Sequence, residues 1–225
     1  MNTKIYKTAM AVGLILIISA CGILAQDKAE EITDQDHEQL LYIENWEGSF
    51  PSPDLPVVSI YIEGHGEIIA ELYPEFAPIT VHNFIELVEE GFYDGLTFHR
   101  IISGFMMQGG CPEGTGTGGS GNTITGEFED NGFYNPLKHE RGILSMARTG
   151  YFNSASSQFF IIDGVASHLD NGFAAVGRVI HGLNIVDSVV AGVTPIDRNG
   201  TVSAEERPVI RHIKLINGSQ IELDQ

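Results

Sequence analysis

Residues 98–110, FHRIISGFMMQGG, hold the side chains of this sequence that are best suited to chemistry. Arg100 stands among aromatic and β-branched residues, and an apolar run with Phe105 and Met106 leads to Gln108 and two glycines. The segment has no obvious nucleophile and no spacing typical of metal ligands. Its arginine is permanently charged, planar and rich in hydrogen-bond donors. A fixed cation beside a soft apolar surface therefore indicates chemistry that needs neither a nucleophile nor a metal.

Other motifs in the chain argue against further classes of site. Residues 114–119 satisfy G-x-G-x-x-G, but the residues that follow cannot start a stable helix, so we interpret them as a glycine-rich loop rather than a dinucleotide site. Residues 197–208 resemble a calcium loop, but Val202 and Pro208 stand where an EF-hand needs glycine and glutamate. The histidines and serines show no HxH, HExxH or G-x-S-x-G spacing. We therefore expect a surface loop at 197–208, no metal, no cofactor and no hydrolase chemistry.

Several spaced segments, taken in order along the chain, resemble the cyclophilin family of peptidyl-prolyl cis–trans isomerases. They are FHRII, GF and QGG within residues 98–110, then GTGTGG, E-F-D, GILSMA, SQFFI, a Leu-Asp pair at 169–170, and VGRVI-G-NIVD. The resemblance runs from about Val57 to Asn217. It implies a mainly β fold, a closed eight-stranded antiparallel barrel capped by two α-helices, and catalysis of rotation about Xaa-Pro peptide bonds.

The resemblance also implies which residues form the site. Arg100 matches the family's catalytic arginine, and we assign Gln108 and Phe105 to catalysis with it. The residues expected to bind the substrate are Met106, Gly116, Ala147, Arg148, Thr149, Gln158, Phe160, His168, Leu169 and Phe173. Three of them depart from the family pattern: His168 stands where many members have tryptophan, Phe173 where many have histidine, and Arg148 where many have asparagine. The contact at position 148 is expected to involve the backbone.

The residue types suit a proline amide. Rotation about this bond breaks no covalent bond, so a catalyst has only to favour the twisted state. An arginine directed at the amide stabilises that state, while apolar side chains hold the pyrrolidine ring. Proline-containing polypeptides are the expected partners. A chaperone or adaptor module that binds proline segments with little turnover is the alternative.

The hydrophobic pattern predicts the elements that position these residues. Two β-rich runs, 57–64 and 66–74, are split by Gly64-His65-Gly66, which is typical of a hairpin. Further short strands are expected at 96–102, 105–109, 142–147, 157–162, 174–180 and 208–216. One amphipathic helix should begin at Pro78 and stop before Gly91, and a second should cover residues 183–190. Many short strands with two helices favour a barrel or sandwich over a parallel sheet.

The composition is that of a soluble acidic domain. The 225 residues are 43% hydrophobic and 19% charged, with a formal net charge of −18. Such a charge repels phosphate backbones, so we expect no nucleic-acid partner. We assign residues 56–218 to one isomerase domain and 219–225 to a C-terminal tail. A monomer is expected.

The first residues indicate export. Lys4 and Lys7 precede an apolar run too short to span a bilayer comfortably, as in a signal peptide covering residues 1–20. The run ends in Ile-Ser-Ala-Cys, which resembles the lipobox of bacterial lipoproteins and implies lipidation of Cys21. An acidic tether, residues 21–55, would then hold the domain away from a membrane outside the cytoplasm. The alternative is an ordinary signal peptide with a chance cysteine. With Cys21 lipidated, Cys111 has no other cysteine to pair with, so we expect no disulfide framework.

Overall fold

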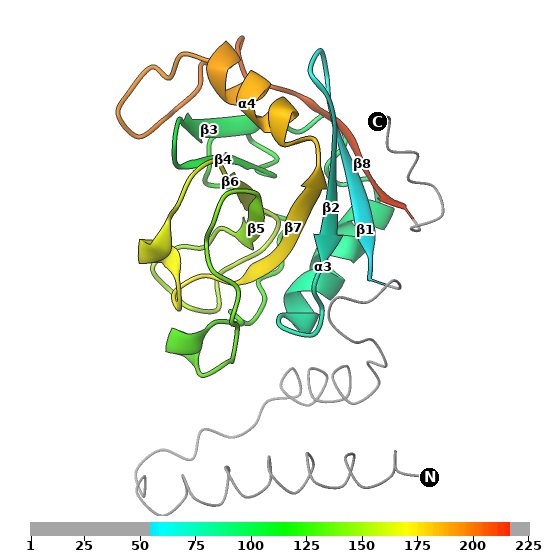
Figure 1. The fold of residues 1–225 in the computed structure, drawn as a ribbon, viewed down its shortest axis with the longest axis vertical. Coiled ribbons are helices and arrows are strands. Elements are labelled where there is room, and N and C mark those ends of the chain that lie inside the picture. Colours follow the sequence, from blue (N-terminus) through cyan, green and yellow to red (C-terminus); the bar gives the residue numbers. More distant parts are fainter. Residues whose placement is uncertain (1–54, 217–225) are drawn as a thin grey trace, which may run out of the picture. The chain divides into compact units, whose positions relative to one another are not determined.

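The computed structural model describes residues 55–216, in which one antiparallel sheet of eight strands and two α-helices form (Figure 1). The strands are β1 (Val57–Ile62), β2 (Gly66–Leu72), β3 (Phe98–Ile102), β4 (Met106–Gly109), β5 (Ile143–Met146), β6 (Phe159–Ile162), β7 (Ala175–His181) and β8 (Ile210–Ile216). The helices are α3 (Pro78–Glu89) and α4 (Leu183–Gly192), with short 3₁₀ helices η1 (Glu129–Asn131) and η2 (Ser167–Leu169). The predicted strands and helices are confirmed, with ends that differ by a few residues.

The predicted N-terminal features lie outside the described residues. These features are the signal peptide 1–20, the lipidation site Cys21 and all of the tether 21–55 except its last residue. The predicted tail 219–225 lies outside them as well. Between residues 55 and 216, neither helix is long and apolar enough to cross a bilayer.

The strands follow the order β3-β4-β6-β5-β7-β2-β1-β8, so β3 and β8 are the two edges of the sheet. The prediction of a closed barrel is therefore wrong, because the sheet is an open half-barrel. The segments that precede the edge strands meet at an isolated bridge between Thr97 and Val209, where the Phe98 amide donates to the Pro208 carbonyl at 3.0 Å. A continued ladder needs a return bond from the amide of residue 208. Proline has no N–H, so Pro208 cannot supply it.

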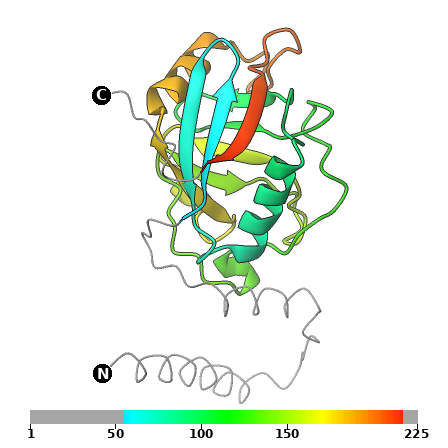
Figure 2. The ribbon, with the colours of Figure 1, turned by 90° about the vertical axis from the view of Figure 1, so that its right-hand side faces the viewer.

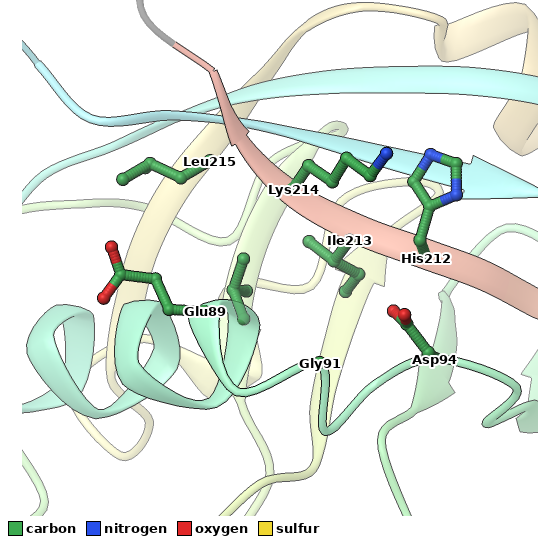
Figure 3. A pocket seen from close by; sticks show the side chains of 8 residues that line it. Glu89, Gly91, Asp94, His212, Ile213, Lys214 and Leu215 are labelled. Carbon is green, nitrogen blue, oxygen red and sulfur yellow. The ribbon is translucent and has the colours of Figure 1, made fainter.

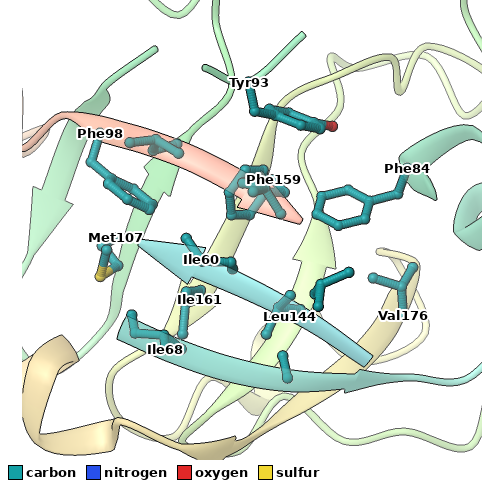
Figure 4. Packing of buried hydrophobic residues seen from close by; sticks show 14 of the residues in the cluster. Ile60, Ile68, Phe84, Tyr93, Phe98, Met107, Leu144, Phe159, Ile161 and Val176 are labelled. Atoms are coloured by element: carbon teal, nitrogen blue, oxygen red, sulfur yellow. The ribbon is translucent and has the colours of Figure 1, made fainter. Parts of the chain in front are cut away.

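One face of the sheet and both helices enclose the inner core (Figure 4). Helix α3 packs against β8 and helix α4 against β2, and Figure 2 shows α3 beside the C-terminal strand. The ring of Phe159 lies at the centre, with its centroid 5.5 Å from that of Phe84, 5.6 Å from that of Tyr93 and 5.9 Å from that of Phe98. These edge-to-face contacts join α3, the segment after it, β3 and β6.

The opposite face of the sheet carries a second, smaller set of apolar residues, here called the outer cluster. Its buried members are Met106, Ile143, Phe160, Ile162, Ala166, Leu169 and Ala175, with Ile102, Phe105, Leu137, Ala147 and Phe173 partly buried against them. Strand residues alternate between the two faces of a sheet, so one ladder supplies both sets.

Helix α3 begins with a proline and is capped from a distance. Pro78 occupies the first turn, and Ala77 before it gives no side-chain cap. Instead the buried carboxylate of Glu127 accepts the amides of Ile79 and Thr80 at 3.1 Å and 2.7 Å, and the Thr80 hydroxyl at 2.5 Å. An anion at a helix N-terminus satisfies free N–H groups and complements the helix dipole.

A β-bulge in β3 turns Arg100 to the outer face. Phe98 pairs with Gly109 and Arg100 pairs with Gln108, so His99 is an extra residue in the ladder. The bulge allows Phe98 to enter the inner core although Arg100, two residues later, lies on the other face. The His99 side chain is 5% exposed, and neither of its ring nitrogens has a hydrogen-bond partner among residues 55–216. Burial, helped by the charges of Arg207 and Arg100, lowers the pKa of His99 to about 4.

We predict that Glu127→Gln lowers the free energy of unfolding by roughly 1–3 kcal/mol, because the amide has one acceptor oxygen where the carboxylate has two. Chemical denaturation followed by circular dichroism measures the change. Glu129→Gln, two residues on and exposed, is the matched control and should stay within about 0.5 kcal/mol of the original. Equal losses in the two variants would contradict the assignment of Glu127 as the cap.

We predict that His99 makes stability fall as the pH drops from about 6.5 to about 4. In this window the unfolded chain binds a proton on His99 and the folded chain does not, so protons favour unfolding; above it the contribution to stability is complete. His99→Phe should remove up to roughly 3 kcal/mol of this pH dependence. Urea titrations at several pH values test it, with the exposed His181→Phe as the control. A His99→Phe slope equal to the original would show that the prediction is wrong.

Candidate active site

Four adjacent strands place the predicted site residues in one row. Arg100 on β3 pairs with Gln108 on β4, Gln108 pairs with Phe160 on β6, and Phe160 pairs with Ser145 on β5. Directly paired residues of neighbouring strands project to the same face of a sheet. The cation, the amide and the aromatic ring therefore stand side by side on the outer face, and they remain there as long as the register holds.

A small pocket of about 160 Å³ opens along this row. Its lining residues are Arg100, Phe105, Met106, Gln108, Ala147, Arg148, Phe160, Leu169 and Phe173. All of them belong to the site predicted from the sequence. The residue types are apolar except for two guanidinium groups and one amide, as expected of a slot that holds an apolar ring beside fixed donors.

A second pocket of about 480 Å³ adjoins the first and shares Gln108, Ala147 and Arg148 with it. It contains the predicted residues Gly116, Thr149 and Gln158 and a set that the sequence analysis missed: Thr117, Gly118, Gly119, Gly121, Asn122, Thr123, Ser154 and Ser156. Their backbone and small side chains offer hydrogen-bonding groups to an extended chain. The predicted residue His168 lines neither pocket; it is exposed, with its ring 5.3 Å from that of Phe105.

Arg100 is held from two sides. Its Nε donates to the carbonyl oxygen of Asn199 at 2.7 Å, and its Nη1 donates to Oε1 of Gln108 at 3.3 Å. The guanidinium carbon also lies 5.9 Å from the centre of the Phe105 ring. Burial lowers the pKa of Arg100 from its ordinary value, while the charge of Asp197 acts in the opposite direction. The group keeps its proton at neutral pH, because arginine titrates far above it.

The loop that holds Arg100 from outside the sheet was interpreted from sequence only as a surface loop. It is exposed, and Asp197 closes it by accepting the amides of Asn199 and Thr201 at 2.9 Å and 3.0 Å and the Thr201 hydroxyl at 2.8 Å. The bonds from Thr201 lower the pKa of Asp197, so the carboxylate stays ionised in mildly acidic solution. The Asp-Arg-Asn-Gly-Thr sequence is a turn signal, but nothing in it identifies Arg100 as its target.

A directed chain of amides holds Gln108. Its Nε2 donates to Oε1 of Gln158 at 2.9 Å, and Nε2 of Gln158 donates to the carbonyls of Gly116 and Gly118 at 3.0 Å and 2.7 Å. Since Oε1 of Gln108 already accepts from Arg100, the orientation of both glutamine amides is determined by their partners. Gln158 therefore lines the second pocket and also helps to hold Arg100 in place, through Gln108.

Phe160, at the floor of the small pocket, rests on a buried His–Asp–Ser chain that the sequence analysis missed. The His139 ring stacks on Phe160 with centroids 6.1 Å apart, its Nδ1 lies 3.0 Å from Asp170 and its Nε2 lies 2.9 Å from the Ser145 hydroxyl. Burial lowers the pKa of His139, against the influence of Asp170. Ser145 is fully buried and also donates to the carbonyl of Ala174, so it cannot meet a substrate as a nucleophile. The chain instead supports Phe160 from below.

Arg148 contributes a side chain where only a backbone contact was expected. Its guanidinium carbon lies 4.6 Å, 5.0 Å and 5.3 Å from the ring centres of Phe173, Phe128 and Phe152. Its Nε donates to the carbonyl of Gly172 at 2.7 Å and its Nη1 to that of Thr149 at 2.9 Å. These contacts make Arg148 a rigid wall between the two pockets.

A separate pocket of about 540 Å³ lies between the end of α3 and β8 (Figure 3). It is lined by Val88, Glu89, Gly91, Asp94, His212, Ile213, Lys214 and Leu215. None of these residues lines either pocket of the site, and the pocket combines opposite charges on exposed side chains. Within residues 55–216 no three histidine, cysteine or acidic side chains are grouped to hold a metal ion.

Comparison with known proteins agrees with this geometry. Residues 57–215 match the model of the family described as cyclophilin type peptidyl-prolyl cis-trans isomerase/CLD. Peptidyl-prolyl cis-trans isomerase B of Bacillus subtilis (strain 168) is 50% identical over 131 residues, which are 58% of this chain and 88% of that protein. The peptidyl-prolyl cis-trans isomerase of Helicobacter pylori (strain ATCC 700392 / 26695) is 45% identical over 129 residues, 56% of this chain and 76% of that protein.

The fold is also similar to a crystal structure from Cryptosporidium parvum. That structure is of a cyclophilin type peptidyl-prolyl cis-trans isomerase in the presence of the dipeptide Ala-Pro; the TM-score is 0.63, the identity 31%, and the match covers 71% of this chain and 98% of that chain. These similarities agree with the family match, which covers most of the described residues. The chain belongs to the cyclophilins and is a peptidyl-prolyl cis–trans isomerase.

Proposed function

We propose that this isomerase assists the folding of exported proteins from a lipid anchor outside the cytoplasm, with Arg100 as its catalytic donor. The observation that carries the catalytic part is the position of Arg100, held at the edge of an apolar pocket by Asn199 and Gln108. The observation that carries the location is the N-terminal sequence, in which a basic start, an apolar run and Ile-Ser-Ala-Cys precede an acidic segment.

Rotation about the peptide bond is slow because nitrogen shares its lone pair with the carbonyl, which gives a barrier of ~18–20 kcal/mol. In the twisted state the lone pair is localised on nitrogen. A donor fixed beside that nitrogen, or beside the rotating carbonyl, stabilises charge that the planar states lack. Arg100 suits this role, since it is charged at every working pH and its two anchors keep the guanidinium in place before the substrate arrives.

The other site residues divide the work of holding the substrate. Phe105, Met106, Phe160, Leu169 and Phe173 offer the apolar walls of the small pocket, in which we place the proline ring. Gln108 orients Arg100. Gly116, Ala147, Arg148, Thr149 and Gln158 line the adjoining groove, in which we place the neighbouring residues of the substrate. His168 stands at the rim, beside Phe105.

We further propose that the protein acts as a monomer, because the lining of both pockets is supplied by one chain. The alternative, a module that binds proline segments without turnover, is not favoured, because the chain belongs to a family of enzymes.

We predict that Arg100→Ala slows isomerisation about 10²–10³-fold while peptide affinity changes little, because the interaction is made mainly in the twisted state. Arg100→Lys should lose most of the rate too, since a compact ammonium cannot keep both anchors. The original rate should vary little between about pH 6 and 9. Exchange broadening of an Xaa-Pro peptide in NMR spectra gives the rate, and titration of the same samples gives the affinity.

The exposed Arg178→Ala on β7 is the control for loss of an arginine. An Arg100→Ala variant with full turnover would remove Arg100 from the mechanism. Equal losses of rate and affinity would make it a substrate anchor instead of a catalyst.

We predict that Cys21→Ser releases the protein from the membrane fraction of cells. Each buried methylene of an acyl chain contributes about 0.8 kcal/mol, so two or more chains on Cys21 hold the protein firmly. Fractionation followed by immunodetection measures the distribution, and Cys111→Ser controls for the loss of a thiol. A Cys21→Ser protein that is processed normally and stays on the membrane would show that the lipid anchor is wrong.

A further inference from the structure

Cys111 is a buried thiol inside the glycine-rich loop that follows β4. Its residue is 1% exposed, and its Sγ accepts the amides of Gly116 and Gly118 at 3.2 Å and 3.3 Å. The thiol also lies 3.5 Å from Oε2 of Glu113, to which it can donate. A single sulfur atom therefore joins the start of the loop to two of its later residues.

The same two glycines hold Gln158. Their carbonyls accept from its Nε2, so each glycine is bonded through its amide to Cys111 and through its carbonyl to Gln158. Gly116 has a φ of 84°, which favours glycine, and a Cβ there would lie 3.2 Å from the His99 ring. A Cβ on Gly118 would displace the carboxylate of Glu113, the acceptor beside the Cys111 thiol.

From Gln158 the hydrogen bonds continue without a break to the cation. Gln158 accepts from Gln108 at 2.9 Å, and Gln108 accepts from Arg100 at 3.3 Å. Every donor in this series points toward the glycine loop, so the loop is its last acceptor. The amides of the two glycines that end the series are held by the sulfur of Cys111, which lies beside Glu113.

We propose that Cys111 is a positioning residue of the isomerase, which acts on Arg100 through the glycine loop, Gln158 and Gln108. The inference rests on the catalytic role of Arg100 proposed above. Gly116 is exposed and Gly118 is partly exposed, so without the sulfur their amides can turn to water and the loop loses its order rather than burying unpaired groups. The rate should therefore suffer more than the stability of the fold.

The test compares Cys111→Ala, which removes the acceptor, with Cys111→Ser, which restores a smaller one. We expect the alanine variant to lower kcat about three- to tenfold, the contribution of one or two ordinary hydrogen bonds, and the serine variant to recover at least half of the rate. Faster hydrogen exchange at the Gly116 and Gly118 amides should accompany the loss. Val58→Ala, a buried change in β1, controls for destabilisation and should leave kcat unchanged.

A double-mutant cycle with Gln158→Ala tests the route. If Cys111 acts through Gln158, adding Cys111→Ala to Gln158→Ala costs little more, whereas independent effects multiply. Full kcat in Cys111→Ala, with Arg100→Ala strongly impaired, would overturn this inference and leave the proposed function intact. Full kcat in Arg100→Ala would overturn both. A loss in Cys111→Ala that multiplies with that of Gln158→Ala would overturn the route and with it the positioning role.

Discussion

The site depends on one local departure from a regular ladder, the bulge at His99. In a strand without a bulge, Phe98 and Arg100 would project to the same face, because side chains alternate with a period of two. The inner core needs Phe98 against Phe159, and the outer face needs Arg100 beside Gln108. One extra residue meets both demands. Its cost is an imidazole enclosed without a hydrogen-bond partner in the described part of the chain.

The remaining strands extend this arrangement in two parallel rows. The row of Ile101, Met107, Ile161 and Leu144 is buried in the inner core, and the neighbouring row of Arg100, Gln108, Phe160 and Ser145 faces outward. The inner row fixes the register, since a slip by one residue would expose it. The site residues are thus positioned by hydrophobic burial on the face that they do not occupy. Polar partners, such as His139 under Phe160, then set the finer orientation.

The strands, the helices and most of the pocket lining could be predicted from the sequence. The anchor of Arg100 and the open sheet could not, for physical reasons. Apolar periodicity identified the strands and helices because burial on one face leaves a pattern along the chain. The resemblance to a known family predicted every residue that lines the small pocket. The anchor of Arg100 was missed because Asn199 contributes a carbonyl, which every residue has and no side chain reveals. The closed barrel was wrong because the pairing of the edges does not continue past Phe98: Pro208 has no N–H to donate, and β3 pairs there with residues 200–202.

The two anchors of Arg100 differ in how easily they move. Gln108 sits in the ladder among four strands, where backbone hydrogen bonds open only when much of the domain unfolds. The carbonyl of Asn199 belongs to the exposed part of a loop that is closed by Asp197 and joined to β3 by the bonds from Ile101 to Gly200 and from Val202 to His99. An exposed loop position opens at lower free energy than the middle of a sheet. The guanidinium is accordingly held firmly at Nη1, which bonds to Gln108, and less firmly at Nε, which bonds to Asn199. A donor with this mixed stiffness can follow an amide whose atoms shift as it turns, without leaving the pocket between turnovers.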